Sequence, residues 1–356
     1  MKGIILAGGK GTRLRPLTHT GAKQAIPVAN KPIICYVIED LVAAGIREIG
    51  IIVGYTSERI QSLKDTIGDE KKYGAKITYI EQDAPKGIAH AVYCAKDFIG
   101  GEPFVVYLGD NMLENGIKSF VQEFSCSKAD ASILLTPVEN PSMYGVAYLD
   151  GKGNISKVEE KPANPSSNKA IIGVYLFTKA IFQVIPNLKP SKRGELEITD
   201  AIEGLLKQGS RVIPHVVEGW WDDTGTPEAI LSVNKKVLEG KMKAEMKGTV
   251  EKGAVLSGKV GIGEGTEIDA DTKITGPAII GKNCRIKNSH IGPNVSIGDD
   301  CILQNAKISS SLILEGAKIT YNAAISDSII GKNTQILSDG KKAARIIIGE
   351  NSTIIL

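Results

Sequence analysis

Two patterns of apolar and polar positions take turns over the first 110 residues: short unbroken apolar runs, and segments with apolar residues at helical spacing. An unbroken apolar run at residues 3–6 predicts a buried strand, and similar runs predict strands at residues 49–53, 77–81 and 104–108. Between these runs, apolar residues recur at helical spacing and predict helices at residues 33–45, 57–66 and 87–98. Strands that take turns with helices predict an α/β fold, with a Rossmann-like, mostly parallel sheet and helices on both faces.

The middle of the chain departs from this alternation. Strands are expected at residues 131–138, 146–149, 155–160 and 171–177, separated by Pro, Gly and Asn. Helices are expected at residues 198–207 and 227–238, and Thr226 and Pro227 are suited to cap and open the second of them. For the acidic stretch at 193–200, which precedes the first helix, the most economical interpretation is structural.

The pattern changes again near residue 250. Aliphatic residues then recur about every six positions, beginning with Ile262, Ile268, Ile274, Ile280 and Ile286. This period is typical of a parallel β-helix built from hexapeptides, in which each coil stacks its aliphatic residues into one core. A segment rich in Lys, Met and Glu lies between Gly240 and Gly248. We therefore predict domains at residues 1–240 and 250–356, joined by a linker at 241–249.

Composition and charge exclude several classes of protein. The 43 basic and 40 acidic residues are interspersed and the net charge is only +3, so no nucleic-acid footprint is expected. No apolar run approaches bilayer length, and the N-terminus has no signal-peptide pattern. The five cysteines form no Cys-x-x-Cys pair and suit a reducing compartment, and the four histidines show no metal-ligand spacing. We expect a cytoplasmic protein with neither a nucleic-acid nor a membrane partner.

A glycine-rich loop follows the first predicted strand, which ends at Leu6. Gly8, Gly9 and Gly11 have no Cβ, so backbone N–H groups can approach a phosphate closely. Thr12 and the cations Arg13 and Lys23 follow this turn, and cations of both kinds bind phosphate. The Walker A and Rossmann loops are excluded, because Gly11 follows Lys10 and Leu14 stands where a third small residue is needed.

Polar residues at the ends of two later strands are the next candidates. Gln82 closes the strand at 77–81 and precedes Gly87, and its carboxamide offers the donor and acceptor that suit a pyrimidine edge. Asp110 follows the strand at 104–108 and presents a carboxylate at the carboxyl edge of the sheet. Carboxylates together with phosphate oxygens are typical ligands of Mg²⁺.

The run at residues 6–18 reads Leu-Ala-Gly-Gly-x-Gly-Thr-Arg-Leu-x-Pro-Leu-Thr and resembles the signature of the sugar-1-phosphate nucleotidyltransferase family. The resemblance extends over essentially the whole chain and is strongest to the long form of the thymidylyltransferase branch, which ends in a left-handed β-helix. It implies transfer of dTMP from dTTP to glucose 1-phosphate, with release of pyrophosphate and with Mg²⁺ as the cofactor.

The resemblance also assigns residues to roles. The implied nucleotide-binding residues are Leu6, Gly8, Gly9, Gly11, Thr12, Arg13, Gln24, Gln82 and Gly87. The implied sugar-binding residues are Tyr144, Gly145, Glu160, Lys161, Gly173 and Trp221. Arg13, Lys23 and Lys161 are the implied catalytic cations, and Asp110 and Asp223 the implied metal ligands.

Several alternatives stay open at this point. A base-contacting Gln cannot settle dTTP against UTP, because a hydrophobic pocket discriminates a methyl group by only about 1–3 kcal/mol. Hexapeptide β-helices often belong to acyltransferases, and His290 is the histidine in this half of the chain that could act as a base. A third hypothesis is an inactive regulatory or oligomerisation subunit. In each case we expect a homo-oligomer.

Overall fold

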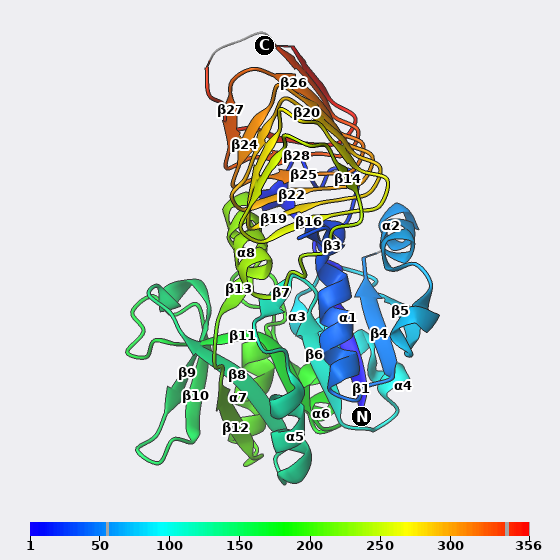
Figure 1. Ribbon diagram of the computed structural model, residues 1–356. Coiled ribbons are helices and arrows are strands. Elements are labelled where there is room, and N and C mark those ends of the chain that lie inside the picture. The colour runs from blue at the N-terminus through cyan, green and yellow to red at the C-terminus, as the bar shows by residue number, and fades with distance from the viewer. Residues whose placement is uncertain (55–56, 339–341, 356) are drawn as a thin grey trace. The chain divides into compact units, whose positions relative to one another are not determined.

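The computed structural model describes residues 1–54, 57–338 and 342–355. Its contacts divide the chain into two compact units (Figure 1). The first unit comprises Met1–Gly9 and Ile34–Asp223, and the second comprises Lys10–Ile33 and Thr224–Leu356. Part of the glycine-rich signature therefore belongs to the same unit as the C-terminal repeats. The domain boundaries drawn from composition at residues 240 and 250 stay a prediction.

A mixed sheet runs through the first unit. Its parallel part contains β1 (Lys2–Leu6), β4 (Glu48–Val53), β5 (Lys76–Glu81) and β6 (Phe104–Leu108). Its remaining strands are β8 (Ala131–Pro137), β9 (Gly145–Leu149), β10 (Ile155–Glu160), β11 (Lys169–Phe177) and β12 (Val212–Val216). The order is β10-β9-β11-β6-β1-β4-β5, and β11 runs antiparallel to β6, β8 and β9. The Rossmann-like α/β prediction is confirmed.

Helices connect these strands and cover the core. They are α1 (Ile33–Ala43), α2 (Ser57–Ile67), α3 (Ile88–Cys94), α4 (Lys96–Ile99), α5 (Lys118–Cys126), α6 (Ile181–Val184) and α7 (Ile198–Lys207). The expected single helix at 87–98 is two helices, because the backbone of Ala95 leaves helical geometry at φ −88° and ψ 2°. In the hydrophobic core of this unit, Phe104 of β6 stacks on Phe182 of α6, with 5.4 Å between ring centroids.

The second unit contains a parallel β-helix with three faces. The first face consists of β14 (Thr249–Val250), β17 (Glu267–Ile268), β20 (Arg285–Lys287), β23 (Ile302–Gln304), β26 (Lys318–Tyr321), β29 (Gln335–Ser338) and β31 (Thr353–Ile355). The second consists of β15 (Val255–Ser257), β18 (Lys273–Thr275), β21 (His290–Ile291), β24 (Lys307–Ser309) and β27 (Ala324–Ser326). The third consists of β16 (Val260–Ile262), β19 (Ala278–Ile280), β22 (Val295–Ile297), β25 (Leu312–Ile313), β28 (Ile329–Ile330) and β30 (Ile347–Ile348).

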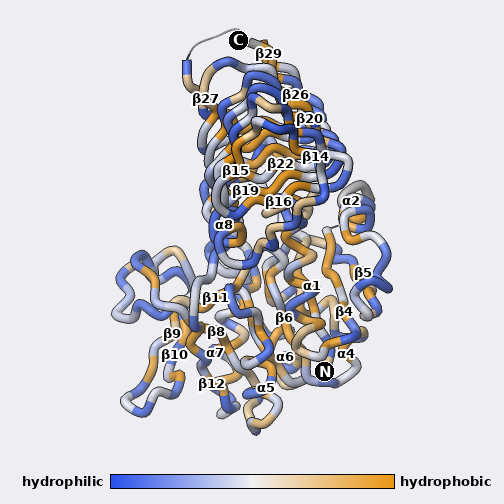
Figure 2. Tube along the Cα trace, in the orientation of Figure 1, coloured by the Kyte–Doolittle hydropathy of each residue, from blue (hydrophilic) through white to orange (hydrophobic). Residues whose placement is uncertain are grey.

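The six-residue period fits these coils because three hexapeptides make one turn of about eighteen residues. On the first face, Ile286 is in register with Leu303, and Leu303 with Ile319. All three are buried in one continuous core. Figure 2 shows the resulting hydrophobic bands along the coils. This stacking is the geometry of the predicted left-handed β-helix.

A hairpin and a helix complete the second unit. Strands β2 (Pro27–Val28) and β3 (Lys31–Pro32) are joined by Ala29 and Asn30, both at positive φ as a type I′ turn requires. Helix α8 (Pro227–Gly240) begins as predicted, since the Thr226 side chain accepts a hydrogen bond from the N–H of Ala229. Among the described residues, every helix is too short or too polar to span a lipid bilayer.

Candidate active site

The two predicted metal carboxylates come from one small antiparallel ribbon in the first unit. It consists of β7 (Asn111–Leu113) and β13 (Trp221–Asp223), and Asn111 lies opposite Asp223 in its register. Asp110 directly precedes Asn111 and is 7% exposed, while Asp223 is half-buried. Opposed residues of an antiparallel pair lie about 5 Å apart. The ribbon thus pairs the backbone segments of two aspartates that are 113 residues apart in the sequence.

Asn111 is a residue that the sequence analysis missed. Its Nδ2 donates a hydrogen bond to Asp110 Oδ1 at 3.2 Å. Its Oδ1 accepts one from Gly173 N–H at 3.2 Å and another from Trp221 Nε1 at 2.7 Å. A Cβ on Gly173 would lie 2.6 Å from this oxygen, so the glycine makes room for the carboxamide. One buried Asn therefore fixes Asp110 relative to two predicted sugar-binding residues.

A backbone hydrogen bond and a ring contact join two more of the predicted sugar-binding residues to Trp221. The N–H of Lys161 donates to the carbonyl of Tyr144 at 3.0 Å, and the Tyr144 ring packs edge-on against Trp221 with centroids 5.7 Å apart. Lys161 has φ +41°, an uncommon conformation for a residue with a side chain. Its side chain is exposed. Strained backbone of this kind is frequent at functional sites, where surrounding contacts hold it.

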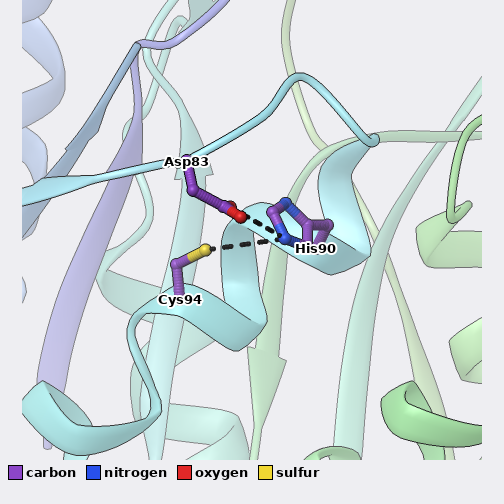
Figure 3. A group of neighbouring side chains, drawn as sticks. All are labelled: Asp83, His90 and Cys94. Carbon is purple, nitrogen blue, oxygen red and sulfur yellow. Dashed lines mark hydrogen bonds and ion pairs between the residues drawn. The ribbon is translucent and has the colours of Figure 1, made fainter. Parts of the chain in front are cut away.

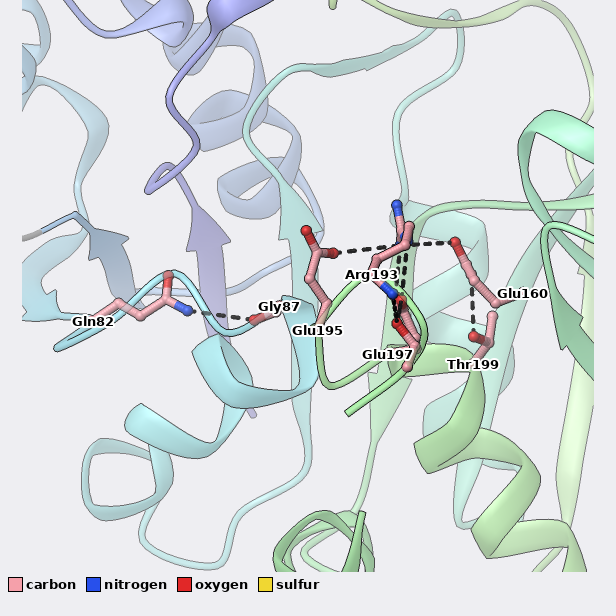
Figure 4. A network of polar contacts seen from close by, with 8 residues as sticks. Gln82, Gly87, Glu160, Arg193, Glu195, Glu197 and Thr199 are labelled. Atoms are coloured by element: carbon pink, nitrogen blue, oxygen red, sulfur yellow. Dashed lines mark hydrogen bonds and ion pairs between the residues drawn. The ribbon is translucent and has the colours of Figure 1, made fainter. Parts of the chain in front are cut away.

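Glu160 lies in a charged network that Figure 4 shows. Thr199 Oγ1 donates to Glu160 Oε2 at 3.1 Å, and Arg193 Nη2 donates to Glu160 Oε1 at 3.2 Å. Arg193 also binds the buried Glu197 through Nε and Nη2, at 3.1 and 2.7 Å. The structural role expected for residues 193–200 therefore includes holding the Glu160 carboxylate, which is predicted to accept hydrogen bonds from sugar hydroxyls.

The surroundings of Glu160 have opposing effects on the pKa of its carboxyl group. Burial and the neighbouring Glu197 charge raise the pKa of the Glu160 carboxyl, and the hydrogen bond from Thr199 works against that rise. The Arg193 guanidinium also favours ionised Glu160. Gly145 lies beside the network, where a Cβ would come within 2.6 Å of the Thr199 methyl and 3.3 Å of Glu160 Oε2. Glycine at this position therefore lets the two side chains meet.

The predicted base-binding residues of the first unit lie at the ends of β1 and β5. Gln82 is 8% exposed, and a Cβ on Gly8 would lie 3.1 Å from its Oε1. Gln82 Nε2 donates to the Gly87 carbonyl at 3.3 Å (Figure 4). The carbonyl of Leu6 accepts the Gly109 N–H at 3.0 Å, which ties the end of β1 to the loop that carries Asp110. Gly9 is exposed beyond Gly8.

The other predicted nucleotide-binding residues belong to the second unit. Gly11 has φ +63° and its carbonyl accepts a hydrogen bond from Thr18 Oγ1 at 2.7 Å. Two short 3-10 helices then carry the predicted contacts, η1 (Thr12–Leu14) with Thr12 and Arg13, and η2 (Lys23–Ala25) with Lys23 and Gln24. Thr12 and Arg13 are exposed, Lys23 is half-buried and Gln24 is 1% exposed. Gln24 Oε1 is buried without a hydrogen bond from the described residues.

One group of potential metal ligands was not singled out from the sequence. His90 and Cys94 are four residues apart on α3, and Asp83 from the preceding loop joins them (Figure 3). His90 Nε2 lies 3.2 Å from Asp83 Oδ1 and 4.0 Å from Cys94 Sγ. The signal was present in the sequence, because residues four apart share one face of a helix.

The fold and these strand-end residues are those of an α/β enzyme that forms nucleotide sugars. The family model described as nucleotidyl transferase matches residues 2–240, and the chain belongs to this family of enzymes. A second model, described as the GMPPB C-terminal domain, matches residues 274–355.

Relatives extend the likeness beyond the catalytic domain. The chain is 44% identical to a glucose-1-phosphate thymidylyltransferase of Streptomyces antibioticus, over 99% of each chain. It is 51% identical to the low-salt glycan biosynthesis nucleotidyltransferase Agl11 of Haloferax volcanii, over 74% of this chain and 73% of that protein. The predicted resemblance to thymidylyltransferases is confirmed.

Two solved structures are also similar to this chain. A Bacillus anthracis protein described as a glucose-1-phosphate thymidylyltransferase, in complex with a sucrose, is 38% identical with a TM-score of 0.63, and the match covers 69% of this chain and 98% of that one. A UDP-glucose pyrophosphorylase complexed with UDP-glucose is 28% identical with a TM-score of 0.61, and the match covers 67% of this chain and 98% of that one.

Proposed function

We propose that this enzyme transfers dTMP from dTTP to glucose 1-phosphate and releases pyrophosphate. The observation that carries the proposal is the β7–β13 ribbon, which pairs the Asp110 and Asp223 segments beside the sugar-side residues held by Asn111. The 44% identity to a thymidylyltransferase over the whole chain supports dTTP and glucose 1-phosphate as the substrates.

In this reaction a phosphate oxygen of the sugar 1-phosphate attacks the α-phosphorus of dTTP in line, and the bond to pyrophosphate breaks. A phosphate dianion is already nucleophilic, so positioning and charge neutralisation supply most of the acceleration. We assign Gly8, Gly9, Gly11 and Thr12 to the triphosphate. Arg13 and Lys23 then neutralise charge on the triphosphate and at the α-phosphate.

The remaining residues bind the base of the nucleotide and the sugar 1-phosphate. Gln24 and Gln82 bind the base, each through a carboxamide that offers a donor and an acceptor. Lys161 binds the phosphate of the incoming sugar, and Glu160 accepts hydrogen bonds from sugar hydroxyls. Tyr144 and Trp221 offer aromatic surface beside them.

We propose Mg²⁺ as the cofactor, held by Asp110 and Asp223. The donor set fits, because both ligands are carboxylates at the β7–β13 ribbon, Asp223 within β13 and Asp110 directly before β7. Mg²⁺ takes one or two carboxylates together with phosphate oxygens and water. When bound, the ion would neutralise charge on the reacting phosphates. Asn111 would keep Asp110 oriented toward it through the 3.2 Å hydrogen bond.

A panel of sugar 1-phosphates against dTTP, UTP, GTP and ATP, with pyrophosphate release as the readout, tests the proposal. We expect the largest kcat/KM for dTTP with glucose 1-phosphate, and a requirement for Mg²⁺. Preference for UTP would establish the uridylyl alternative, and no release with any pair would establish an inactive subunit.

Lys23→Ala or Asp110→Ala should reduce turnover by about 10² or more. Exposed Lys179→Ala and Asp271→Ala are the matched controls.

Acetyl transfer by the β-helix is a weaker candidate. His290 is exposed on β21, between Lys273 and Lys307 of the neighbouring coils. An acetyl-CoA assay with wild type and His290→Ala would detect such an activity.

We also propose that the protein is a homo-oligomer and lies in the cytoplasm. Light scattering measures the oligomeric state, and cell fractionation measures the localisation. The five free cysteines fit a reducing compartment.

A further inference from the structure

Three side chains of metal-ligating type converge beside Gln82, outside the residues assigned to catalysis. Asp83 follows Gln82 in the loop after β5, and His90 and Cys94 lie one helical turn apart on α3 (Figure 3). Their ligand atoms all lie within 4.8 Å of one another. His90 and Cys94 are partly buried, whereas Asp83 is exposed, so the group is open to solvent on one side.

The spacing of the ligand atoms fits a tetrahedral cation. Bonds of about 2.0 Å to N and O and about 2.3 Å to S place the ligand atoms of tetrahedral zinc about 3.3–3.6 Å apart. The distances found here are 3.2 Å from His90 Nε2 to Asp83 Oδ1 and 4.0 Å from His90 Nε2 to Cys94 Sγ. A small movement of the Cys94 side chain would complete three ligands. A mixed N, S and O set suits Zn²⁺ rather than Mg²⁺.

The hydrogen bonds of His90 connect this group to Gln82. Gln82 Nε2 lies 3.2 Å from His90 Nδ1 and 3.3 Å from the carbonyl of Gly87, so this amide nitrogen donates to two acceptors. His90 Nδ1 therefore accepts, and its proton is on Nε2, facing Asp83. The other atom of the carboxamide, Gln82 Oε1, faces Gly8.

A cation on Nε2 would reverse this arrangement. The neutral imidazole then carries its proton on Nδ1, and two donors, Nδ1–H and the Gln82 amide, would face each other. Rotating the carboxamide by half a turn relieves the conflict and presents Oε1 to His90. The same rotation breaks the bond to Gly87 and turns the amide nitrogen toward Gly8.

We propose that Asp83, His90 and Cys94 form a binding site for a borderline-soft divalent cation such as Zn²⁺, and that occupancy reverses the carboxamide of Gln82. The second half rests on the proposed function, in which Gln82 binds the base. A reversed carboxamide offers the base a donor where it had offered an acceptor, so the bound cation weakens nucleotide binding. Burial, together with the Asp83 charge, raises the pKa of the Cys94 thiol, so the cation displaces a proton when it binds.

Cobalt binding to the metal-free full-length protein tests the site without any assay of activity. We expect one Co²⁺ per chain, with tetrahedral visible bands and a thiolate-to-cobalt band in the ultraviolet, and Zn²⁺ should displace it. Cys94→Ser should abolish the thiolate band, whereas Cys126→Ser, an exposed cysteine elsewhere in the unit, should keep it. Absence of stoichiometric binding, or a thiolate band that persists in Cys94→Ser, overturns the site.

Kinetics with excess Mg²⁺ test the effect on Gln82. One equivalent of Zn²⁺ should raise the KM for dTTP several-fold in wild type and Cys126→Ser, and leave the KM of Cys94→Ser unchanged. An unchanged KM in zinc-loaded wild type, or equal inhibition of Cys94→Ser, overturns the coupling to Gln82. A protein that binds Co²⁺ as expected but transfers no nucleotide would refute the proposed function and leave the cation site standing.

Discussion

Asn234 of α8 accepts a hydrogen bond from Ser296 of β22, with 2.7 Å between its Oδ1 and the Ser296 Oγ. The same oxygen accepts the N–H of Ala29 at 2.9 Å. Ala29 has φ +47°, a conformation that costs free energy for a residue with a Cβ, and this bond helps to hold it. Asn234 and Ser296 are both buried, so one carboxamide joins the hairpin, the helix and the β-helix within the second unit.

Replacing Asn234 by Ala should therefore destabilise the second unit. The buried Ser296 hydroxyl and the half-buried Ala29 N–H would lose their acceptor, and leaving such groups unsatisfied costs about 1–3 kcal/mol. Urea unfolding measures the difference, and Lys235→Ala, exposed on the same helix, is the control. An Asn234→Ala midpoint equal to that of the control would mean that water replaces the carboxamide.

Gly173→Ala should disturb the site more than the fold. The new methyl would meet the Asn111 carboxamide at 2.6 Å and push it away from Asp110. Overpacking of this kind costs about 1–3 kcal/mol of stability. We expect an at least tenfold loss of kcat and a weaker apparent affinity for Mg²⁺.

Gly151→Ala is the matched control, because a Cβ there meets no atom within 4 Å. Its kinetics should equal those of wild type. Unchanged magnesium dependence in Gly173→Ala would argue against a role for Asn111 in orienting Asp110.

Activity should depend on the ionisation of Glu160. Because burial and Glu197 raise the pKa of the Glu160 carboxyl, the acid limb of the kcat/KM profile should lie above the ordinary value of 4.5. Arg193→Met removes a cation that favours the carboxylate, so this limb should move to higher pH. Glu159→Gln alters an exposed neighbour and should leave the limb in place.

The raised pKa of Glu160 also makes the stability of the protein depend on pH. A carboxyl whose pKa is raised in the folded state contributes stability below its unfolded pKa, and this contribution is lost as the pH rises through the folded pKa. Glu160→Gln should therefore be closest to wild type in stability near pH 4 and gain relative to it toward pH 7. Urea unfolding across this range measures the trend. A gap that widens on acidification would contradict the raised pKa of Glu160.

Leu303→Ala should weaken the β-helix. Leu303 is fully buried between Ile286 and Ile319, and removing such a side chain from a core costs about 2–5 kcal/mol. Leu337→Ala, on the same face of the coil but 44% exposed, should cost far less. Thermal unfolding of the two variants compares them directly, and equal midpoints would contradict a continuous inner stack.

Much of this fold follows from periodicity. The apolar runs at residues 3–6 and 104–108 are long enough to predict buried parallel strands, and the six-residue repeat predicts the β-helix. The β7–β13 ribbon could not be predicted, because a three-residue strand has too short a pattern to separate it from a loop. Asp110 could be predicted from its place after a buried strand and Asp223 only from the resemblance, whereas the pairing of their segments depends on this ribbon.

The contacts between side chains were less predictable than the strand ends. Asn111 adjoins Asp110 in the sequence, but nothing there indicates that it also binds Trp221. Arg193 and Glu160 are 33 residues apart and meet only because β10 packs against α7, and Arg193 lies just before that helix. The spacing of His90 and Cys94 was visible, but Asp83 joins them only through the path of the loop after β5.

The membership of residues 10–33 in the C-terminal unit limits how this enzyme can be recombined with its relatives. The hairpin turn is fastened to the β-helix by Asn30, whose Nδ2 donates to the Ile297 carbonyl at 2.6 Å, and by the Ala29 bond to Asn234. A chimera spliced at residue 240 would set a foreign solenoid against a native hairpin. Grafts that transplant residues 10–33 together with 224–356 would keep both partners of each bond.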